Sequence, residues 1–176
     1  MNNFNKYLVS FFDNLRNSTP ICTIHVLEVF EQIQEGKWSK QIEACKNDLN
    51  KKKVLPCFTP SGIFLKRNKQ GIENYSGLIC LDIDKVNDPE RLKEQCKTIP
   101  WIWSTFITPS GSGLKIFVQT PSELSQFQIY EAEVARAFYT ITGYLRDEKS
   151  KDLARLQFVS YDEKIYINEN PILFKI

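Results

Sequence analysis

The sequence predicts an α+β domain with a mixed, largely antiparallel sheet covered by helices and a small N-terminal α/β lobe. Two observations favour this class over a doubly wound parallel sheet. Short apolar runs flanked by turn residues suggest hairpins, and they alternate irregularly with segments of helical period. No repeat or long linker divides the chain, so we expect one domain, 1–176, with an N-terminal lobe (1–75) and a core (76–176).

The lobe is expected to open with a strand and two helices. The apolar and aromatic run from Tyr7 to Phe12 predicts the strand. Apolar residues at helical spacing between Ile24 and Glu35 predict the first helix, with Thr23 as its cap. Ser39 offers a cap for the second helix.

A hairpin should complete the lobe. Residues 54–58 and 63–65 are apolar, and the turn-forming segment 59–62 lies between them. The polar stretch 68–74 is expected to be a loop.

The strongest strand signal is 77–83, because large apolar residues at alternate positions predict one buried face. We expect this strand at the centre of the sheet. A helix should follow from Asp88, with Pro89 in its first turn, to about Thr98.

Aromatic and β-branched residues in 101–108 and 114–120 predict a second hairpin. The longest helix should begin after Ser122, with an apolar stripe that includes Ile141, and end at Gly143. Segments 156–160 and 165–167 are expected to be closing strands.

Composition excludes several classes of protein. The chain is 42% apolar and has no run long enough to span a membrane. Five cysteines without a C-x-x-C pair argue against zinc, iron–sulfur clusters and disulfides. The N-terminal residues carry no secretory signal pattern, so we expect a cytoplasmic protein. His25, the only histidine, is expected to be structural, which disfavours a Ser-His-Asp triad.

The net charge of +2 does not mark a nucleic-acid-binding surface by itself, so such a partner would need a local patch. A candidate patch consists of Lys51, Lys52, Lys53, Lys66, Arg67 and Lys69. The alternative is a solvated face around a turn.

Asp82 and Asp84 stand two residues apart at the end of the strongest strand, so their carboxylates should share one face. A divalent cation such as Mg²⁺ would relieve their repulsion, since hard cations bind carboxylate oxygens. The alternative is that Asp84 only ends the strand.

The segment 108–115 combines hydroxyls, flexible backbone amides and a cation, which are the groups that hold phosphate. It is not a Walker A loop, because Leu114 separates Gly113 from Lys115 and a strand follows. Alone it would be a hairpin turn. Lys115 should share a strand face with Phe117 and so reach toward the aspartates.

Asp152 and Arg155 add another carboxylate and a guanidinium just before a predicted strand. Together the three elements suit phosphoryl transfer: carboxylates hold a metal, the turn and Lys115 hold a triphosphate, and Arg155 offsets developing charge.

The order of these segments resembles the VirE N-terminal domain family of mobile elements, which is similar to the archaeo-eukaryotic primase and primase-polymerase superfamily. The resemblance covers most of the chain and lies in 53–56, 59–64, 76–84, 108–115 and 152–162. It implies an RRM-like core and a nucleotidyltransferase that makes or extends primers in mobile-element or phage replication. It further implies catalytic and metal ligands Asp82, Asp84 and Asp152, and nucleotide contacts Ser110, Gly111, Ser112, Gly113, Lys115 and Arg155.

The expected cofactor is Mg²⁺ or Mn²⁺, and the expected partners are nucleoside triphosphates, a single-stranded DNA template and a helicase or ATPase. One departure is Lys115, which stands where many primase-polymerases carry a histidine. Two alternatives stay open: a non-catalytic nucleic-acid-binding module that recruits a helicase, and a D-x-D glycosyltransferase that would use the same carboxylates.

Overall fold

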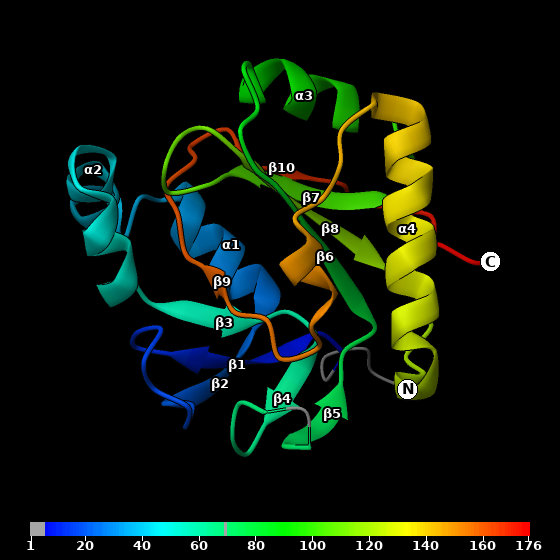
Figure 1. Ribbon diagram of the computed structural model, residues 1–176, viewed down its shortest axis with the longest axis horizontal. Helices are drawn as coiled ribbons and strands as arrows, with labels where there is room; N and C mark the ends of the chain where they lie inside the picture. Colours follow the sequence, from blue (N-terminus) through cyan, green and yellow to red (C-terminus); the bar gives the residue numbers. More distant parts are fainter. Residues whose placement is uncertain (1–5, 69) are drawn as a thin grey trace.

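The computed structural model describes residues 6–68 and 70–176 and confirms the α+β class (Figure 1). Residues 1–5, part of the segment in which we expect no secretory signal, lie outside the described residues. Every strand pair in the described part of the chain is antiparallel. None of the described helices combines the length and apolar character that crossing a bilayer requires.

One four-stranded sheet is built mainly from the N-terminal half. Its order is β2-β1-β3-β9, so the C-terminal half contributes one strand to it. Its strands are β1 (Leu8–Phe12), β2 (Cys22–His25), β3 (Cys57–Thr59) and β9 (Gln157–Phe158). Helices α1 (Val26–Gln34) and α2 (Ser39–Asn47) and the 3₁₀ helix η2 (Leu49–Val54) lie between β2 and β3 in the chain.

The predicted start of the first helix is wrong. Residues 22–25 form β2 instead, because they pair with β1, and Ile24 lies opposite Val9. Helix α1 begins only at Val26. His25 caps it by accepting a hydrogen bond at Nδ1 from the Leu27 N–H (3.2 Å), so the histidine has a structural role, as expected.

The first predicted hairpin is also wrong, because its two arms belong to different sheets. Strand β3 pairs with β1 and β9, whereas β4 (Gly62–Phe64) pairs with β5 (Ile72–Tyr75), inside the stretch expected to be a loop. The β4 and β5 backbones approach so closely at Gly62 that a Cβ there would lie 1.9 Å from the Asn74 carbonyl oxygen. This close approach requires glycine.

The second four-stranded sheet has the order β10-β7-β8-β6. Strand β6 is therefore an edge strand and not the central strand we expected. The predicted second hairpin and both closing strands are confirmed, although the closing strands are shorter than predicted. The strands are β6 (Leu78–Ile83), β7 (Ile102–Ile107), β8 (Leu114–Gln119) and β10 (Tyr166–Ile167).

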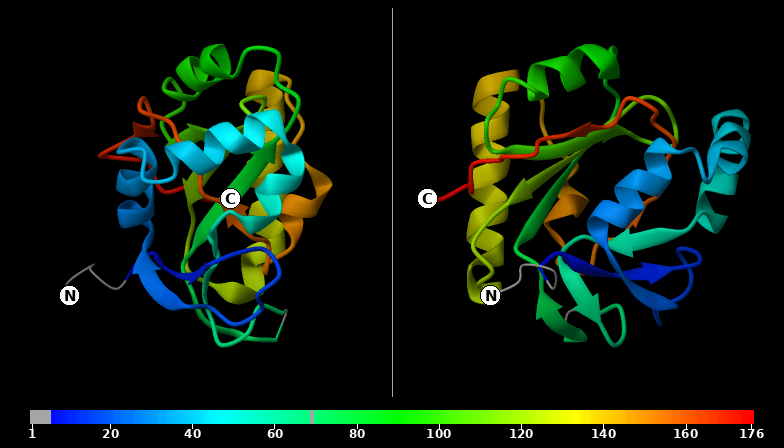
Figure 2. Two further views of the ribbon diagram at one scale, coloured as in Figure 1. Left: turned by 90° about the vertical axis from the view of Figure 1, so that its left-hand side faces the viewer. Right: turned by 180° about the vertical axis from the view of Figure 1, so that it is seen from behind.

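Both faces of this sheet are covered, which explains why β6 is buried along its whole length although it lies at an edge. Helices α3 (Pro89–Cys96) and α4 (Phe127–Thr142) pack on one face (Figure 2). Helix α1 and the N-terminal sheet pack on the other face. Leu78, Cys80 and Phe117 point to this second side.

The helix signals of the core are largely confirmed. The Asp88 carboxylate caps α3 by accepting from the Arg91 N–H (3.0 Å), and Pro89 is its first residue. Helix α4 starts later than predicted, because the 3₁₀ helix η3 (Leu124–Gln126) precedes it, and it ends at Gly143 with φ 76°. Ile141 is exposed and does not belong to the buried stripe.

Candidate functional site

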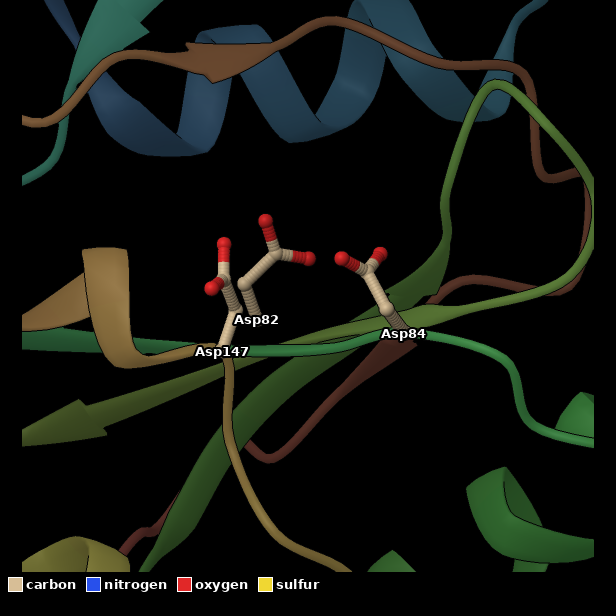
Figure 3. A group of neighbouring side chains, drawn as sticks. All are labelled: Asp82, Asp84 and Asp147. Carbon is tan, nitrogen blue, oxygen red and sulfur yellow. The ribbon is translucent and has the colours of Figure 1, made fainter.

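Three carboxylates meet at the end of β6. Asp82 is in the strand, Asp84 follows it directly, and Asp147 comes from the N-terminus of the 3₁₀ helix η4 (Glu148–Lys151). Each offers a carboxylate oxygen, and these three atoms lie within 4.8 Å of one another. Their side chains point the same way, toward the side of the sheet where β9 and α1 lie (Figure 3).

The backbone holds this arrangement. The Asp147 N–H donates to the Asp82 carbonyl at 2.7 Å, which fixes the start of η4 against β6. The Asp147 carboxylate also caps η4 by accepting from the Lys149 N–H (3.2 Å). The third carboxylate is thus positioned by a local cap and by one hydrogen bond to the neighbouring strand.

Asp82 is the most deeply buried of the three. It lies directly opposite Lys115 across the β6–β8 ladder, and its Oδ2 forms an ion pair with the Lys115 ammonium. The two side chains are only 7% and 3% exposed. The expected orientation of Lys115 toward the aspartates is confirmed.

The second oxygen of Asp82 has no partner. Oδ1 is buried and makes no hydrogen bond. A buried carboxylate oxygen without a partner is costly, and a bound cation would satisfy it. The carboxylates of Asp82, Asp84 and Asp147 together form an all-oxygen donor set, the type that Mg²⁺ and Mn²⁺ prefer.

Asp152, the predicted third metal ligand, is not part of this cluster. It is exposed, and its carboxylate accepts a hydrogen bond from the Ala154 N–H (3.1 Å). Asp147, five positions earlier, occupies the place expected for it. A sequence signal existed, because an aspartate after the Gly143 helix stop is a typical N-cap for a following turn.

Arg155 does lie at the site. Its guanidinium donates to the Asp147 carboxylate at 3.4 Å, while its Nε is buried and has no partner. Ser150 and Gln157 also carry buried polar atoms without a partner, and all three residues line one small cavity. Its volume is about 10 Å³, which is room for a water molecule and not for a nucleotide.

The Ser/Gly-rich turn lies beside the carboxylates. The Ser112 carbonyl accepts from the Val86 N–H (2.9 Å), which joins the turn to the segment after Asp84. The hydroxyls of Thr108, Ser110 and Ser112 form a chain of hydrogen bonds of 3.1 and 3.2 Å.

The glycines of this turn have different roles. Gly111 is exposed with φ 76°, a backbone conformation that favours glycine. Gly113 is buried, and a Cβ there would lie 2.6 Å from the Ile83 carbonyl oxygen, so its lack of a side chain serves packing against β6. Of the predicted nucleotide contacts in the turn, Ser110 is half-buried and Ser112 exposed.

The predicted nucleic-acid patch is not continuous among its described residues, and its member Lys69 lies outside the residues that the structure describes. Lys51 and Lys53 are exposed or half-exposed on η2, whereas Lys66 and Arg67 lie in the β4–β5 connection, well apart from η2 in Figure 1. Arg67 is also tied to the protein, because its guanidinium donates to the Leu15 carbonyl (3.2 Å).

Comparison with known proteins gives one match. A family model described as BT4734-like, N-terminal domain, matches residues 50–167, well over half of the chain. No curated protein and no solved structure matches the chain. The matched range contains the carboxylate cluster, the Ser/Gly-rich turn and Arg155.

This match corrects the resemblance drawn from the sequence. The matching family is a different one from the VirE N-terminal domain family, and no relative or structural neighbour supports the proposed kinship with primase-polymerases. The chain belongs to the family of BT4734-like N-terminal domains.

Proposed function

We propose that this domain is a metal-dependent nucleotidyltransferase that transfers nucleotides from nucleoside triphosphates to a 3′-hydroxyl, so that it makes or extends primers. The observation that carries the proposal is the cluster of Asp82, Asp84 and Asp147, in which the buried Oδ1 of Asp82 has no partner. Phosphoryl transfer needs precise positioning and charge stabilisation more than covalent chemistry. The carboxylate cluster, with Lys115 and Arg155 in contact with it, would provide both the positioning and the charge stabilisation.

Each charged group would have its own role. Asp82, Asp84 and Asp147 would hold Mg²⁺ or Mn²⁺, which when bound would polarise a phosphoryl oxygen and activate the attacking hydroxyl. Lys115 orients the Asp82 carboxylate and balances its charge, because the two groups are in direct contact. Arg155 would offset the negative charge that develops on the phosphate.

The partners in this proposal are nucleoside triphosphates and a single-stranded DNA template, in a cytoplasmic setting. The ammonium groups of Lys51, Lys53 and Lys66, which face solvent, would contact template phosphates. A helicase or ATPase would supply the single strand.

A second function is favoured by one observation. The Lys115 ammonium neutralises one oxygen of Asp82 within the protein itself. A non-catalytic nucleic-acid-binding module that recruits a helicase would keep such an ion pair for stability alone. This alternative and the enzyme differ in whether nucleotides are incorporated.

The test is incorporation of labelled nucleotides on primed and unprimed single-stranded templates with Mg²⁺ or Mn²⁺. Asp84→Asn is the informative variant, because Asp84 is exposed and the change should not disturb folding. Glu43→Gln, at an exposed site on α2, is the matched control. We expect incorporation by the wild type and the control, and its loss in Asp84→Asn. Strand binding without incorporation would favour the non-catalytic module.

A further inference from the structure

Not all charges beside the carboxylates are paired. Two ion pairs are already made: Asp82 with Lys115, and Asp147 with Arg155 at 3.4 Å. Within residues 6–68 and 70–176, no ion pair includes Asp84 or Lys52. Asp84 and Lys52 are therefore both available to bind a ligand.

Lys52 is held on the inner side of η2. Its side chain is half-buried, and its ammonium lies 5.2 Å from the centroid of the Phe158 ring on β9. This cation–π contact turns the side chain toward the N-terminal sheet. β9 is the strand toward which the three carboxylates point (Figure 3).

The charges that act on Lys52 are those of the site. Burial lowers the pKa of Lys52 and repulsion from Lys115 lowers it further, while Asp82 and Asp84 raise it and Arg155 again lowers it. An ammonium that is partly desolvated and repelled by two other cations gains stability when an anion binds beside it.

The Ser/Gly-rich turn lies close to the lysine-bearing segment that contains α2 and η2. A Cβ on Gly111 would lie 3.8 Å from Cε of Lys46 on α2, the helix that leads into η2. The stem of Lys46 therefore lies next to the turn, and the turn itself is joined to the segment after Asp84 by the Val86–Ser112 hydrogen bond.

We propose that Lys52 binds the phosphate chain of a nucleoside triphosphate whose metal ion is held by Asp82 and Asp84; this inference rests on the proposed function. A metal-bound triphosphate needs carboxylates for its cation and a separate cation for its phosphates, and neither Asp84 nor Lys52 is engaged in an ion pair within the described residues. Lysine suits the role because its ammonium is a compact point charge on a flexible stem. Lys115, which the sequence suggested for this contact, is occupied by Asp82.

A phosphate in a nucleic-acid strand offers the same chemistry. Lys52 is the lysine of η2 whose ammonium packs over a β9 ring, whereas Lys51 and Lys53 are exposed, which assigns Lys52 to the nucleotide and leaves Lys51 and Lys53 for the strand. The experiment therefore measures both ligands separately.

The test is equilibrium dialysis of ATP and dATP, with AMP and dAMP in parallel, in the presence of Mn²⁺. Lys52→Ala is compared with Lys53→Ala and with Lys40→Ala, an exposed lysine on α2 that is not among the charges acting on Lys52. We expect Lys52→Ala to weaken triphosphate binding by roughly tenfold or more, as for removal of a charged hydrogen bond, and to leave monophosphate binding nearly unchanged. Lys40→Ala should behave as wild type, and Lys53→Ala should lose affinity only for a single-stranded oligonucleotide. Lys52→Arg should restore much of the triphosphate affinity.

Mn²⁺ binding without nucleotide, measured on the same proteins, separates the two claims. If Mn²⁺ binds and Lys52→Ala keeps wild-type triphosphate affinity, or if Lys52→Ala loses oligonucleotide binding alone, the role of Lys52 is overturned while the metal site stands. If the wild type binds neither Mn²⁺ nor triphosphate, the proposed function fails and the inference falls with it.

Discussion

Asp82 and Lys115 face each other across the β6–β8 ladder, and their side chains form an almost fully buried ion pair. The pair fixes one carboxylate oxygen and leaves the other, Oδ1, without a partner, and the Asp82 carboxylate lies next to those of Asp84 and Asp147. Stability and the candidate chemistry thus depend on the same aspartate.

We predict that Lys115→Met destabilises the protein by roughly 3–5 kcal/mol, because it leaves the Asp82 carboxylate buried and uncompensated. Urea unfolding measures the change. Lys97→Met is the matched control, since the Lys97–Glu94 pair is exposed and such pairs contribute less than about 1 kcal/mol. Equal destabilisation of the two variants would show that the buried pair has no special role in stability.

The double variant Lys115→Met/Asp82→Leu extends this prediction. It removes both charges and replaces them with apolar groups, so it should be more stable than Lys115→Met alone. A double-mutant cycle that gives no coupling energy between the two positions would contradict the ion pair.

The third metal ligand gives a second prediction. Asp147→Asn should weaken Mn²⁺ binding by roughly tenfold or more, taking ~1.5–3 kcal/mol for an interaction with a charged group, whereas Asp152→Asn should have little effect. Isothermal titration with Mn²⁺ measures both. The reverse ranking would assign the third position to Asp152.

A third prediction concerns the strand-binding lysines. Replacing Lys51, Lys53 and Lys66 together by alanine should reduce the dependence of oligonucleotide affinity on salt, by roughly 0.7 in the logarithmic slope for each phosphate that is no longer neutralised. Fluorescence anisotropy at several salt concentrations measures the slope, with Lys40→Ala as the control. An unchanged slope would leave these lysines as a solvated face.

The cysteines give a fourth prediction. Cys22 is exposed, and the other four are buried. Burial raises the pKa of Cys57 and Cys96 to about 12 and also raises that of Cys45 and Cys80. Iodoacetamide at neutral pH should therefore modify Cys22 first and the buried thiols only after unfolding, as mass spectrometry would detect. Early modification of Cys57 would contradict the packing of β3.

The raised pKa values of the buried thiols make the free energy of unfolding depend on pH. Thiols in the unfolded chain titrate near 9.0, below the pKa of about 12 that Cys57 and Cys96 have when folded. Above pH 9 the unfolded state binds fewer protons than the folded state, so the stability contributed by these thiols is lost as pH rises from 9 toward 12. The free energy of unfolding in urea, measured across this range, checks the sign. A Cys57→Ala/Cys96→Ala variant should show a weaker decline.

Local sequence signals predicted the elements whose pattern is strong. The alternation in β6, the Asp88-Pro89 start of α3 and the Gly143 stop of α4 all correspond to the structure, because side-chain periodicity and capping are local properties. The local signals failed where pairing between strands far apart in the sequence determines the structure. Ile24 and His25 lie in the segment predicted to be helical but pair with β1, and β3 and β4 join different sheets.

The candidate site shows the same difference between local signals, which the sequence carries, and contacts between distant segments, which it does not. The strand period placed Asp82 and Asp84 together and turned Lys115 toward them. It did not indicate that Lys115 would be buried in an ion pair, which depends on the register between β6 and β8. The sequence marked Asp147 only as a candidate N-cap and not as a ligand, because it is the folded chain that brings the start of η4 against β6 through a backbone hydrogen bond.

The central claim is that Asp82, Asp84 and Asp147 together bind a divalent cation. The most direct measurement is Mn²⁺ titration followed by electron paramagnetic resonance, which distinguishes free from bound ions, on wild type, Asp84→Asn and the control Glu43→Gln. Saturable binding in the wild type and the control, with competition by Mg²⁺ and loss in Asp84→Asn, is the result that we predict. Binding that is absent in the wild type, or equally strong in Asp84→Asn, would contradict the metal site and the proposed nucleotidyl transfer.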